Sequence, residues 1–427
     1  MKKKTLALGT LLFSTLGLFS FHQNNVNFQK AYADSSFING VEGHIQLRPR
    51  WENVYVEGNG KKTANALTLR TAAILKLKSL FGTKGFNALI EAVNVGAILD
   101  NYAPQKPDYE LVADPPNTRF SQFALTYTKD KTTFIAGRVY VIIDDHRFIG
   151  NVAWRQMFQS FGVLGVSSKA IKNFSILLAG IYERKGIVDS LNADWRLNKM
   201  PIVLDVNYSA HKSLRLKAFA YMITDVHDTF GIKASGKVKL GDAKISYLGE
   251  YAIQNDPYAL DNRPNNRNID TKYYRLSIGT GSKGFFGKLM YTHFGGKDPD
   301  EDAGFSTPLA TLHKFDGWAD VLLPGAANGF DYGMNELSLY LGYKKPDFGK
   351  FMLVYLIFKS DQEPTDPNVS KDIGKELDVL YTKKLTKHLS FLAKAAFYRA
   401  DDGYYTGGNL KGKTDVNKYW LQLNYTY

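Results

Sequence analysis

Apolar and polar residues alternate along most of this chain with a period of two. Residues 419–427 show the pattern clearly, because large apolar side chains occupy every second position and Gln422, Asn424 and Thr426 lie between them. Alternation of this kind predicts a β-strand with one apolar face and one polar face. A chain built from such strands can present one face to an apolar environment and keep the other face wet.

Eighteen segments show this alternation, and each is long enough to cross a bilayer as a tilted strand. They cover residues 40–56, 64–78, 85–98, 118–129, 132–143, 150–166, 173–184, 200–211, 213–224, 229–240, 243–254, 271–281, 284–295, 331–344, 349–360, 373–384, 387–400 and 415–427. We therefore predict an all-β fold, a transmembrane outer-membrane β-barrel of about 18 antiparallel strands; one hairpin more or fewer would give 20 or 16.

The connections between these segments alternate in length. Long links such as residues 99–117 and 295–330 follow odd-numbered strands, whereas tight links such as 129–131 and 240–242 follow even-numbered ones. Outer-membrane barrels have short periplasmic turns and long extracellular loops, so both ends of the predicted barrel lie in the periplasm. Pro49 lies inside the first segment, where its missing N–H predicts a bulge or an irregular strand.

The two ends of the chain support export to the outer membrane. Three lysines follow Met1, an apolar run covers residues 6–21, and Ala31-Tyr32-Ala33 has the small residues of a cleavage site. This arrangement predicts a signal peptide over residues 1–33 and a single barrel domain over residues 34–427. The aromatic carboxy-terminus resembles the last strand of bacterial barrels, so the expected partners are outer-membrane lipid and, through that strand, the barrel-assembly machinery.

Composition narrows the possible functions. The chain has no cysteine, which excludes a disulfide scaffold and a thiolate metal site. Gly279-Thr-Gly-Ser-Lys-Gly284 fits a nucleotide-binding glycine pattern, but a predicted strand rather than a helix follows it. No nucleophile-elbow motif is present. We expect no enzymatic activity, no cofactor or metal and no nucleic-acid partner.

Strand parity predicts which charges face the lumen. A charge on the lipid face at mid-membrane depth costs about 2–4 kcal/mol, so cations on the opposite face belong to the pore. Removal of the four lysines in residues 1–33 lowers the formal charge from +13 to +9, which predicts a basic channel. The cations predicted to line the pore or contact solute are Arg48, Arg50, Arg70, Arg138, Arg147, Arg155, Arg215, Lys217 and Arg275; parity also turns Lys233, Lys237 and Lys244 inward.

Two segments carry a family resemblance. They are residues 144–161, DDHRFIGNVAWRQMFQSF, with Gly137 and Arg138 before them, and residues 306–320, STPLATLHKFDGWAD. Both resemble signatures of the alginate-export-like outer-membrane porin family. The resemblance implies an eighteen-stranded barrel, a basic pore, and a constriction at or near Arg138, Arg147 and Arg155.

The longest predicted loop, residues 295–330, has features of its own. Thr307 before Pro308 has the pattern of a helix N-cap followed by a first-turn proline, which predicts a short helix over residues 308–322. The loop is also acidic, so it can fold inward and pair with the basic wall, or remain an ordinary surface loop. The residues predicted to form a constriction are Asp298, Asp300, Glu301, Asp316, Trp318 and Asp320.

Together these patterns predict an outer-membrane porin of a Gram-negative-type bacterium, with a basic and anion-preferring channel for small anionic or polyhydroxylated solutes. The alternatives left open are an export pore for an anionic polysaccharide such as alginate, a barrel enzyme and a structural adhesin. The sequence is compatible with a monomer or a homotrimer.

Overall fold

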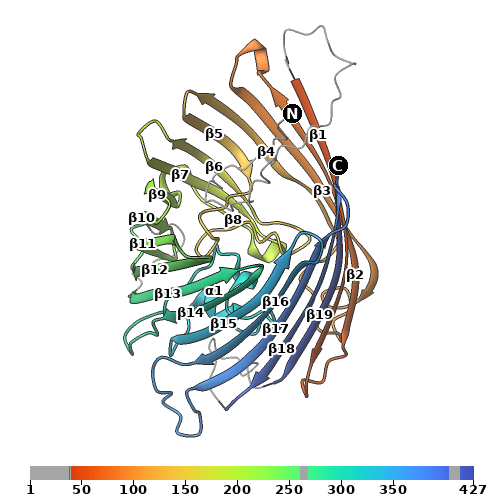
Figure 1. The fold of residues 1–427 in the computed structure, drawn as a ribbon, viewed down its shortest axis with the longest axis vertical. Helices are drawn as coiled ribbons and strands as arrows, with labels where there is room; N and C mark the ends of the chain where they lie inside the picture. Colours follow the sequence, from red (N-terminus) through yellow and green to blue (C-terminus); the bar gives the residue numbers. More distant parts are fainter. Residues whose placement is uncertain (1–37, 39, 260–267, 403–413) are drawn as a thin grey trace.

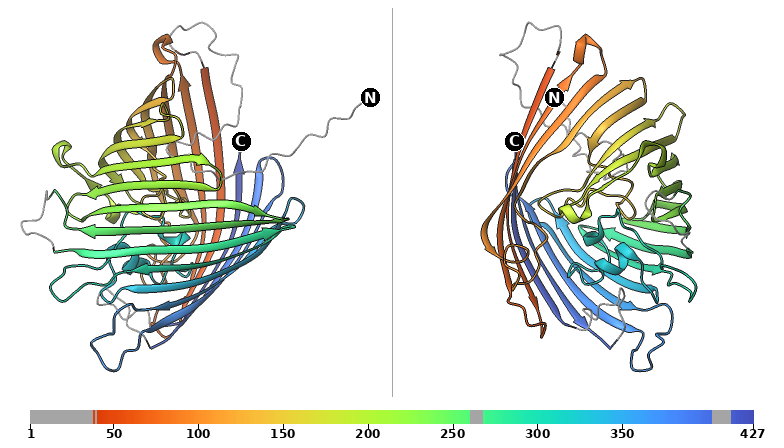
Figure 2. Two further views of the ribbon diagram at one scale, coloured as in Figure 1. Left: turned by 60° about the vertical axis from the view of Figure 1, so that its left-hand side comes forward. Right: turned by 180° about the vertical axis from the view of Figure 1, so that it is seen from behind.

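The structure, a computed structural model, describes residue 38 and residues 40–259, 268–402 and 414–427, and its strands form a closed antiparallel barrel (Figures 1 and 2). The predicted signal peptide lies outside the described residues. The strands are β1 (Gly40–Val56), β2 (Ala64–Lys78), β3 (Phe86–Asn101), β4 (Asn117–Lys129), β5 (Thr132–Val139), β6 (Ser160–Ser168), β7 (Phe174–Lys185), β8 (Ala193–Asp194), β9 (Ile202–His211), β10 (Leu214–Ile223), β11 (His227–Leu240), β12 (Ala243–Asn255), β13 (Asp270–Ser282), β14 (Phe285–Phe294), β15 (Met334–Lys345), β16 (Gly349–Lys359), β17 (Asp372–Lys384), β18 (Leu389–Ala400) and β19 (Val416–Thr426).

Consecutive strands pair all the way round, and β1 closes the barrel by pairing with both β2 and β19. The two-residue β8 pairs only with the end of β7, and β7 also pairs directly with β9. The described wall therefore has eighteen strands, and the predicted fold class is confirmed. Closure leaves no free sheet edge, so the strands satisfy their backbone hydrogen bonds within the wall, as a membrane requires.

One part of the strand prediction is wrong. Residues 140–143 and 150–159 were assigned to two predicted strands, but they belong to one loop, residues 140–159, between β5 and β6. Pro49 makes the strand irregular rather than bulged, because β1 and β2 stay in register through the Pro49 and Leu69 pair. Its effect is confined to the other side, where the β1–β19 pairing skips Arg48 and Pro49 and resumes in the same register.

The outer face of the wall is apolar and exposed. Phe123 on β4, Ile278 on β13 and Leu341 on β15 have exposed fractions of 62%, 58% and 50%, and similar residues occupy the outward positions of the other strands. Such a surface is stable only against lipid, so this face is the membrane-contacting one. Among the described residues, no helix is long and apolar enough to cross a membrane.

Two long loops, residues 140–159 and 295–333, fold inside the barrel, where the short helix α1 (Leu323–Asn328) is visible in Figures 1 and 2. The loops bury an aromatic cluster against the wall, in which the ring of Phe148 contacts those of Phe219, Tyr273 and Phe305. The predicted helix over residues 308–322 is wrong. That segment holds only a 3-10 turn, η4 (Leu312–Lys314), and the Thr307 hydroxyl donates to the Ala326 carbonyl instead of capping a helix.

Three further 3-10 turns lie in other connections of the barrel. They are η1 (Leu80–Gly82), η2 (Asp189–Leu191) and η3 (Leu197–Lys199).

Candidate functional site

The two inward loops are joined to each other. The Gly150 amide donates to the Leu309 carbonyl at 2.9 Å, and the Thr311 amide donates to the His146 carbonyl at 3.0 Å. Arg147 donates two hydrogen bonds to the Asp316 carboxylate, at 2.8 and 3.0 Å, with both side chains fully buried. The two loops therefore form one plug within the barrel rather than two independent flaps.

Arginines from β1 and β2 hold one side of this plug. Arg48 donates to the Gln156 side chain at 2.8 Å and to the Ala153 carbonyl at 2.9 Å. Arg70 forms an ion pair with Glu91 at 2.7 Å and also donates to the Gln156 carbonyl. These arginines point inward as parity predicted, but they contact the plug and not an open lumen.

Arg155 is the centre of a second anchor. Its guanidinium lies 3.1 Å from Glu52 on β1 and 3.1 Å from Asp320 in the other loop. Asp114 is 3.6 Å from both Arg155 and Arg50. The sequence placed Arg155 on a strand, whereas the structure places it in the loop of residues 140–159, where it connects both loops to the wall.

The paired aspartates 144 and 145 hold the opposite side of the plug. Asp144 lies 2.6 Å from Lys233 and also near Lys217 and Arg215, at 3.7 and 3.9 Å. Asp145 lies 2.7 Å from Arg275, which also pairs with Glu250. Burial alone would raise the pKa of Asp145, but Arg275 and then Lys233 hold it well below its ordinary value. Both aspartates are therefore anions at neutral pH.

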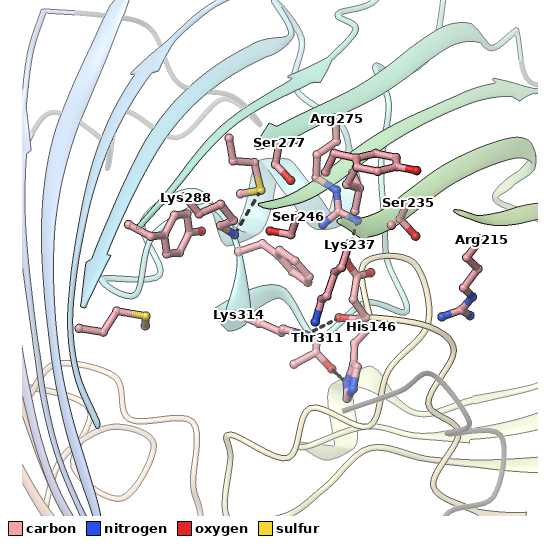
Figure 3. A pocket seen from close by; sticks show the side chains of 18 of the residues that line it. His146, Arg215, Ser235, Lys237, Ser246, Arg275, Ser277, Lys288, Thr311 and Lys314 are labelled. Atoms are coloured by element: carbon pink, nitrogen blue, oxygen red, sulfur yellow. Dashed lines mark hydrogen bonds and ion pairs between the residues drawn. The ribbon is translucent and has the colours of Figure 1, made fainter. Parts of the chain in front are cut away.

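Beside the plug lies a cavity of about 1270 Å³ (Figure 3). It extends from the loops toward the turns that join β9 to β10 and β11 to β12. Nine lysines and arginines line it, against one acidic residue, Asp145, among the described lining residues. The nine cations are Lys212, Arg215, Lys237, Lys239, Lys244, Arg275, Lys288, Lys314 and Lys394.

Several of these cations form no ion pair with a described residue. The Lys288 amine lies 3.8 Å from the Met290 sulfur and 3.7 Å from the centre of the Tyr340 ring, and Lys314 donates to the Asp145 carbonyl. The register places Lys237, Ser246, Gly279 and Lys288 in one row across β11 to β14. Strand spacing puts the two lysine positions roughly 14 Å apart, with a floor of small residues between them.

His146 also faces this cavity (Figure 3). Burial, followed by the charge of Lys314, lowers the pKa of His146 to about 4. The imidazole is therefore neutral at pH 7 and adds no charge to the cavity wall. Lysines and arginines supply positive charge to the cavity wall.

The predicted pore-lining residues separate into two groups. Arg215 and Arg275 line the cavity, whereas Arg48, Arg50, Arg70, Arg147, Arg155 and Lys217 are buried among plug contacts and Arg138 pairs with Glu183 at 2.7 Å. The prediction missed Lys212, Lys239, Lys288, Lys314 and Lys394, which also line the cavity. The inward parity of Lys288 was available from the sequence, but the position of Lys314 depends on how the loop folds.

The predicted constriction residues also separate. Asp316, Trp318 and Asp320 lie inside the barrel, in contact with Arg147, Lys394 and Arg155 respectively. Asp298, Asp300 and Glu301 lie in the outer part of the loop, where the Asp298 amide donates to Glu301 and the Asn268 side chain donates to the Asp300 carbonyl. The inner half of this loop therefore lies inside the barrel, and its outer half packs against the neighbouring loop.

No protein-family model matches the chain, and no curated protein matches it. Solved structures resemble it over most of its length: Pseudomonas aeruginosa OccK1 (OpdK) with a TM-score of 0.68 and 12% identity, and Acinetobacter baumannii OccAB2 with 0.69 and 15%. In both cases the alignment covers 92% of this chain and 99% of the other.

At these identities the likeness shows the fold alone, an eighteen-stranded barrel of the kind found in outer-membrane porins. The predicted resemblance to the alginate-export-like family is not supported, because no model of that or any other family matches. The two segments that suggested it lie in the two inward loops, apart from Ser160 and Phe161, which begin β6.

Proposed function

We propose that this barrel is a passive outer-membrane channel for small anionic solutes. The observation that carries the proposal is the charge of the cavity, where nine lysines and arginines face one aspartate among the described lining residues. Cations confined in a water-filled space of low-dielectric walls raise the local concentration of anions and repel cations. Because lysines such as Lys237 and Lys288 have no carboxylate partner in the described part of the barrel, their charge is available to a solute.

The rest of the cavity lining indicates what else such a solute carries. The rings of Phe315, Trp318 and Tyr340 lie beside the cations and offer an apolar surface. Ser235, Ser246 and Ser277 supply hydroxyls on the floor of the cavity (Figure 3). We therefore assign the channel to small carboxylates with a flat apolar or hydroxylated body. One of the similar structures is described as OpdK with vanillate, a solute of this type.

The direct test is electrophysiology of the purified protein in a planar bilayer. In a salt gradient the reversal potential should have the sign of anion preference. Vanillate added to one side should reduce the single-channel current, whereas the uncharged vanillyl alcohol at the same concentration should not. A cation-preferring reversal potential, or equal block by both compounds, would contradict the proposal.

The membrane partners remain predictions. The exposed apolar wall requires lipid, and the final residues close the barrel because the Tyr427 amide donates to the Ile45 carbonyl at 2.9 Å. Removal of residues 425–427 should therefore lower the amount of assembled barrel in the outer membrane. Cross-linking in native membranes would distinguish a monomer from a homotrimer.

A further inference from the structure

His313 occupies an unusual position in the plug. Its ring stacks on Trp154 with centroids 4.4 Å apart and an angle of 7° between the planes, and the edge of Trp420 lies against it at 5.7 Å. The Nδ1 atom is 2.5 Å from an oxygen of Asp320, and the Nε2 atom is 2.6 Å from the amine of Lys394. The side chain is 5% exposed, so water does not compete for these contacts.

The contact between His313 and Lys394 restricts how many protons the pair can hold. A hydrogen bond between two nitrogen atoms needs a lone pair on one of them. With Nδ1 donating to Asp320, either Nε2 accepts from the lysine ammonium or the neutral lysine amine accepts from Nε2. A further proton would place two N–H groups, both on cations, against each other at 2.6 Å. While they are in contact, His313 and Lys394 therefore cannot both be cations, although each would bind a proton in acid if the two were apart.

These three residues attach the plug to the wall at β18. His313 and Asp320 belong to the loop of residues 295–333, whereas Lys394 is on β18. Asp320 also lies 3.1 Å from Lys418 on β19 and 3.1 Å from Arg155 in the other loop. The Lys394 amine additionally lies 3.7 Å from the ring centre of Trp318 and 4.1 Å from that of Trp154. We call His313, Asp320 and Lys394 the latch.

The charges around His313 come from every element packed against it. Asp320 favours the protonated ring, whereas Lys394 and Arg155 oppose it. The other charged groups near the latch are Arg50 and Glu52 on β1, Asp114 in the loop between β3 and β4, Glu376 and Asp378 on β17, and Lys418 on β19. Burial is the largest influence and lowers the pKa of His313 well below its ordinary value near 6.5.

The sign of the pH dependence follows. A histidine whose pKa is lower in the folded state stabilises that state at high pH, and this stability is lost as the pH falls below about 6.5. Near neutral pH the latch is closed. In acid, the additional proton separates His313 from Lys394.

We propose that the latch is a proton-sensitive switch that holds the plug against β18 at neutral pH and releases it in acid. Release loosens the loop of residues 295–333 and widens the path through the barrel. The switch does not depend on which solute the barrel conducts, and only the conductance experiment rests on the proposed channel function.

The first experiment follows protonation through tryptophan fluorescence of the folded barrel in detergent. Three of the five tryptophans, Trp154, Trp318 and Trp420, surround the latch. The wild-type protein should show a fluorescence step below about pH 6.5 that H313Q lacks, since the glutamine side chain can donate and accept hydrogen bonds but does not titrate. H388Q is the matched control, because His388 lies in the turn between β17 and β18, where its contacts are Thr426 and the rings of Tyr425 and Tyr427.

K394M provides an independent variant. Methionine carries no charge at this position, so His313 can bind a proton while its Nδ1 atom still donates to Asp320. The midpoint of the fluorescence step should therefore move to higher pH by about one unit or more. The shift in mobility between unboiled and boiled protein on a denaturing gel verifies that each variant is folded. An unchanged step in H313Q, or an unchanged midpoint in K394M, would overturn the proposal.

The second experiment measures conductance at about 1 M salt, where the Debye length is ~3 Å and the charge of the cavity wall is largely screened. Mean single-channel conductance should rise in wild type and in H388Q as the pH falls from 7.5 to 4.5. It should stay constant in H313Q. Equal pH responses of wild type and H313Q would overturn the release step. A barrel that conducts at no pH would contradict the proposed channel, while the fluorescence step would still test the latch.

Discussion

The interior of this barrel has two differently organised basic regions. Where the plug meets the wall, cations such as Arg70, Arg155 and Lys233 are buried and face carboxylates at 2.6 to 3.1 Å. Along the cavity, Lys237, Lys244 and Lys288 come from the same kind of inward strand position but form no ion pair with a described residue. The residue types are similar, and the difference lies in whether a loop covers them.

This difference separates structural charge from functional charge. A buried cation without a partner would cost several kcal/mol, so covered arginines need the carboxylates that the loops and neighbouring strands bring. A lysine at the cavity surface remains hydrated and needs no partner, so its field acts on mobile ions. We therefore expect the covered cations to control stability and the uncovered ones to control ion preference.

The largest expected effect is the loss of a covered cation. R155M removes the charge that faces Glu52, Asp114 and Asp320, and leaves Glu52 buried without its closest cation. We expect a loss of about 3–5 kcal/mol in the free energy of unfolding, measured by denaturant titration in detergent.

The matched control is R399Q, which removes an arginine whose ion pair with Asp415 is about half exposed. Exposed pairs contribute about 0–1 kcal/mol, so this variant should unfold close to the wild-type midpoint. Similar losses in both variants would show that burial does not separate the two classes of arginine.

A second test replaces cavity lysines, which no loop covers, with glutamine. The quadruple variant K237Q/K244Q/K288Q/K314Q should lower the anion-to-cation permeability ratio by about threefold or more, because charge-lined clefts concentrate counterions about tenfold or more. The effect should be largest at low salt, where screening is weakest. Reversal potentials in a salt gradient provide the measurement.

The control for this variant replaces four lysines outside the cavity lining: Lys129, Lys131, Lys345 and Lys384. It changes the net charge equally and should leave the permeability ratio within error of wild type. Equal shifts in the two variants would assign the preference to diffuse net charge, and the two regions would no longer differ in function.

Arg48 is intermediate between the two classes of cation. It is buried, but its partners are Gln156 and loop carbonyls rather than a carboxylate. R48Q should cost about 1–3 kcal/mol, less than R155M, because it leaves unpaired neutral acceptors and no unpaired charge. Denaturant titration of R48Q and R155M side by side ranks their losses in the free energy of unfolding. A larger loss in R48Q would contradict this expectation.

The smallest effect is expected at the outer rim. The triple variant D298N/D300N/E301Q neutralises acids in the outer part of the loop, away from the plug contacts. Single-channel conductance should change by less than that of the four-lysine variant at the same salt concentration. A larger change would place this outer segment in the conduction path.

The sequence alone determined the wall of this protein. Two-residue alternation specifies which side chains face lipid, and alternating link lengths specify which ends of the strands carry loops, because both properties are local. The strand count and the inward direction of Arg48, Arg70 and Arg275 could be predicted for this reason. The largest error in strand placement came at residues 140–143 and 150–159, which were assigned to strands but lie in the loop between β5 and β6.

Only the tertiary structure decided what the inward charges do. Whether Arg155 lies on the wall or in a plug depends on contacts between residues more than a hundred positions apart, with Asp320 and Glu52. Loop residues have no periodic pattern to indicate such contacts, because their positions are set by the buried aromatic cluster and by ion pairs that form only once the barrel has closed. The loops cover the inward arginines at the plug and leave the cavity lysines uncovered. The tertiary structure therefore decides which cations a solute can reach.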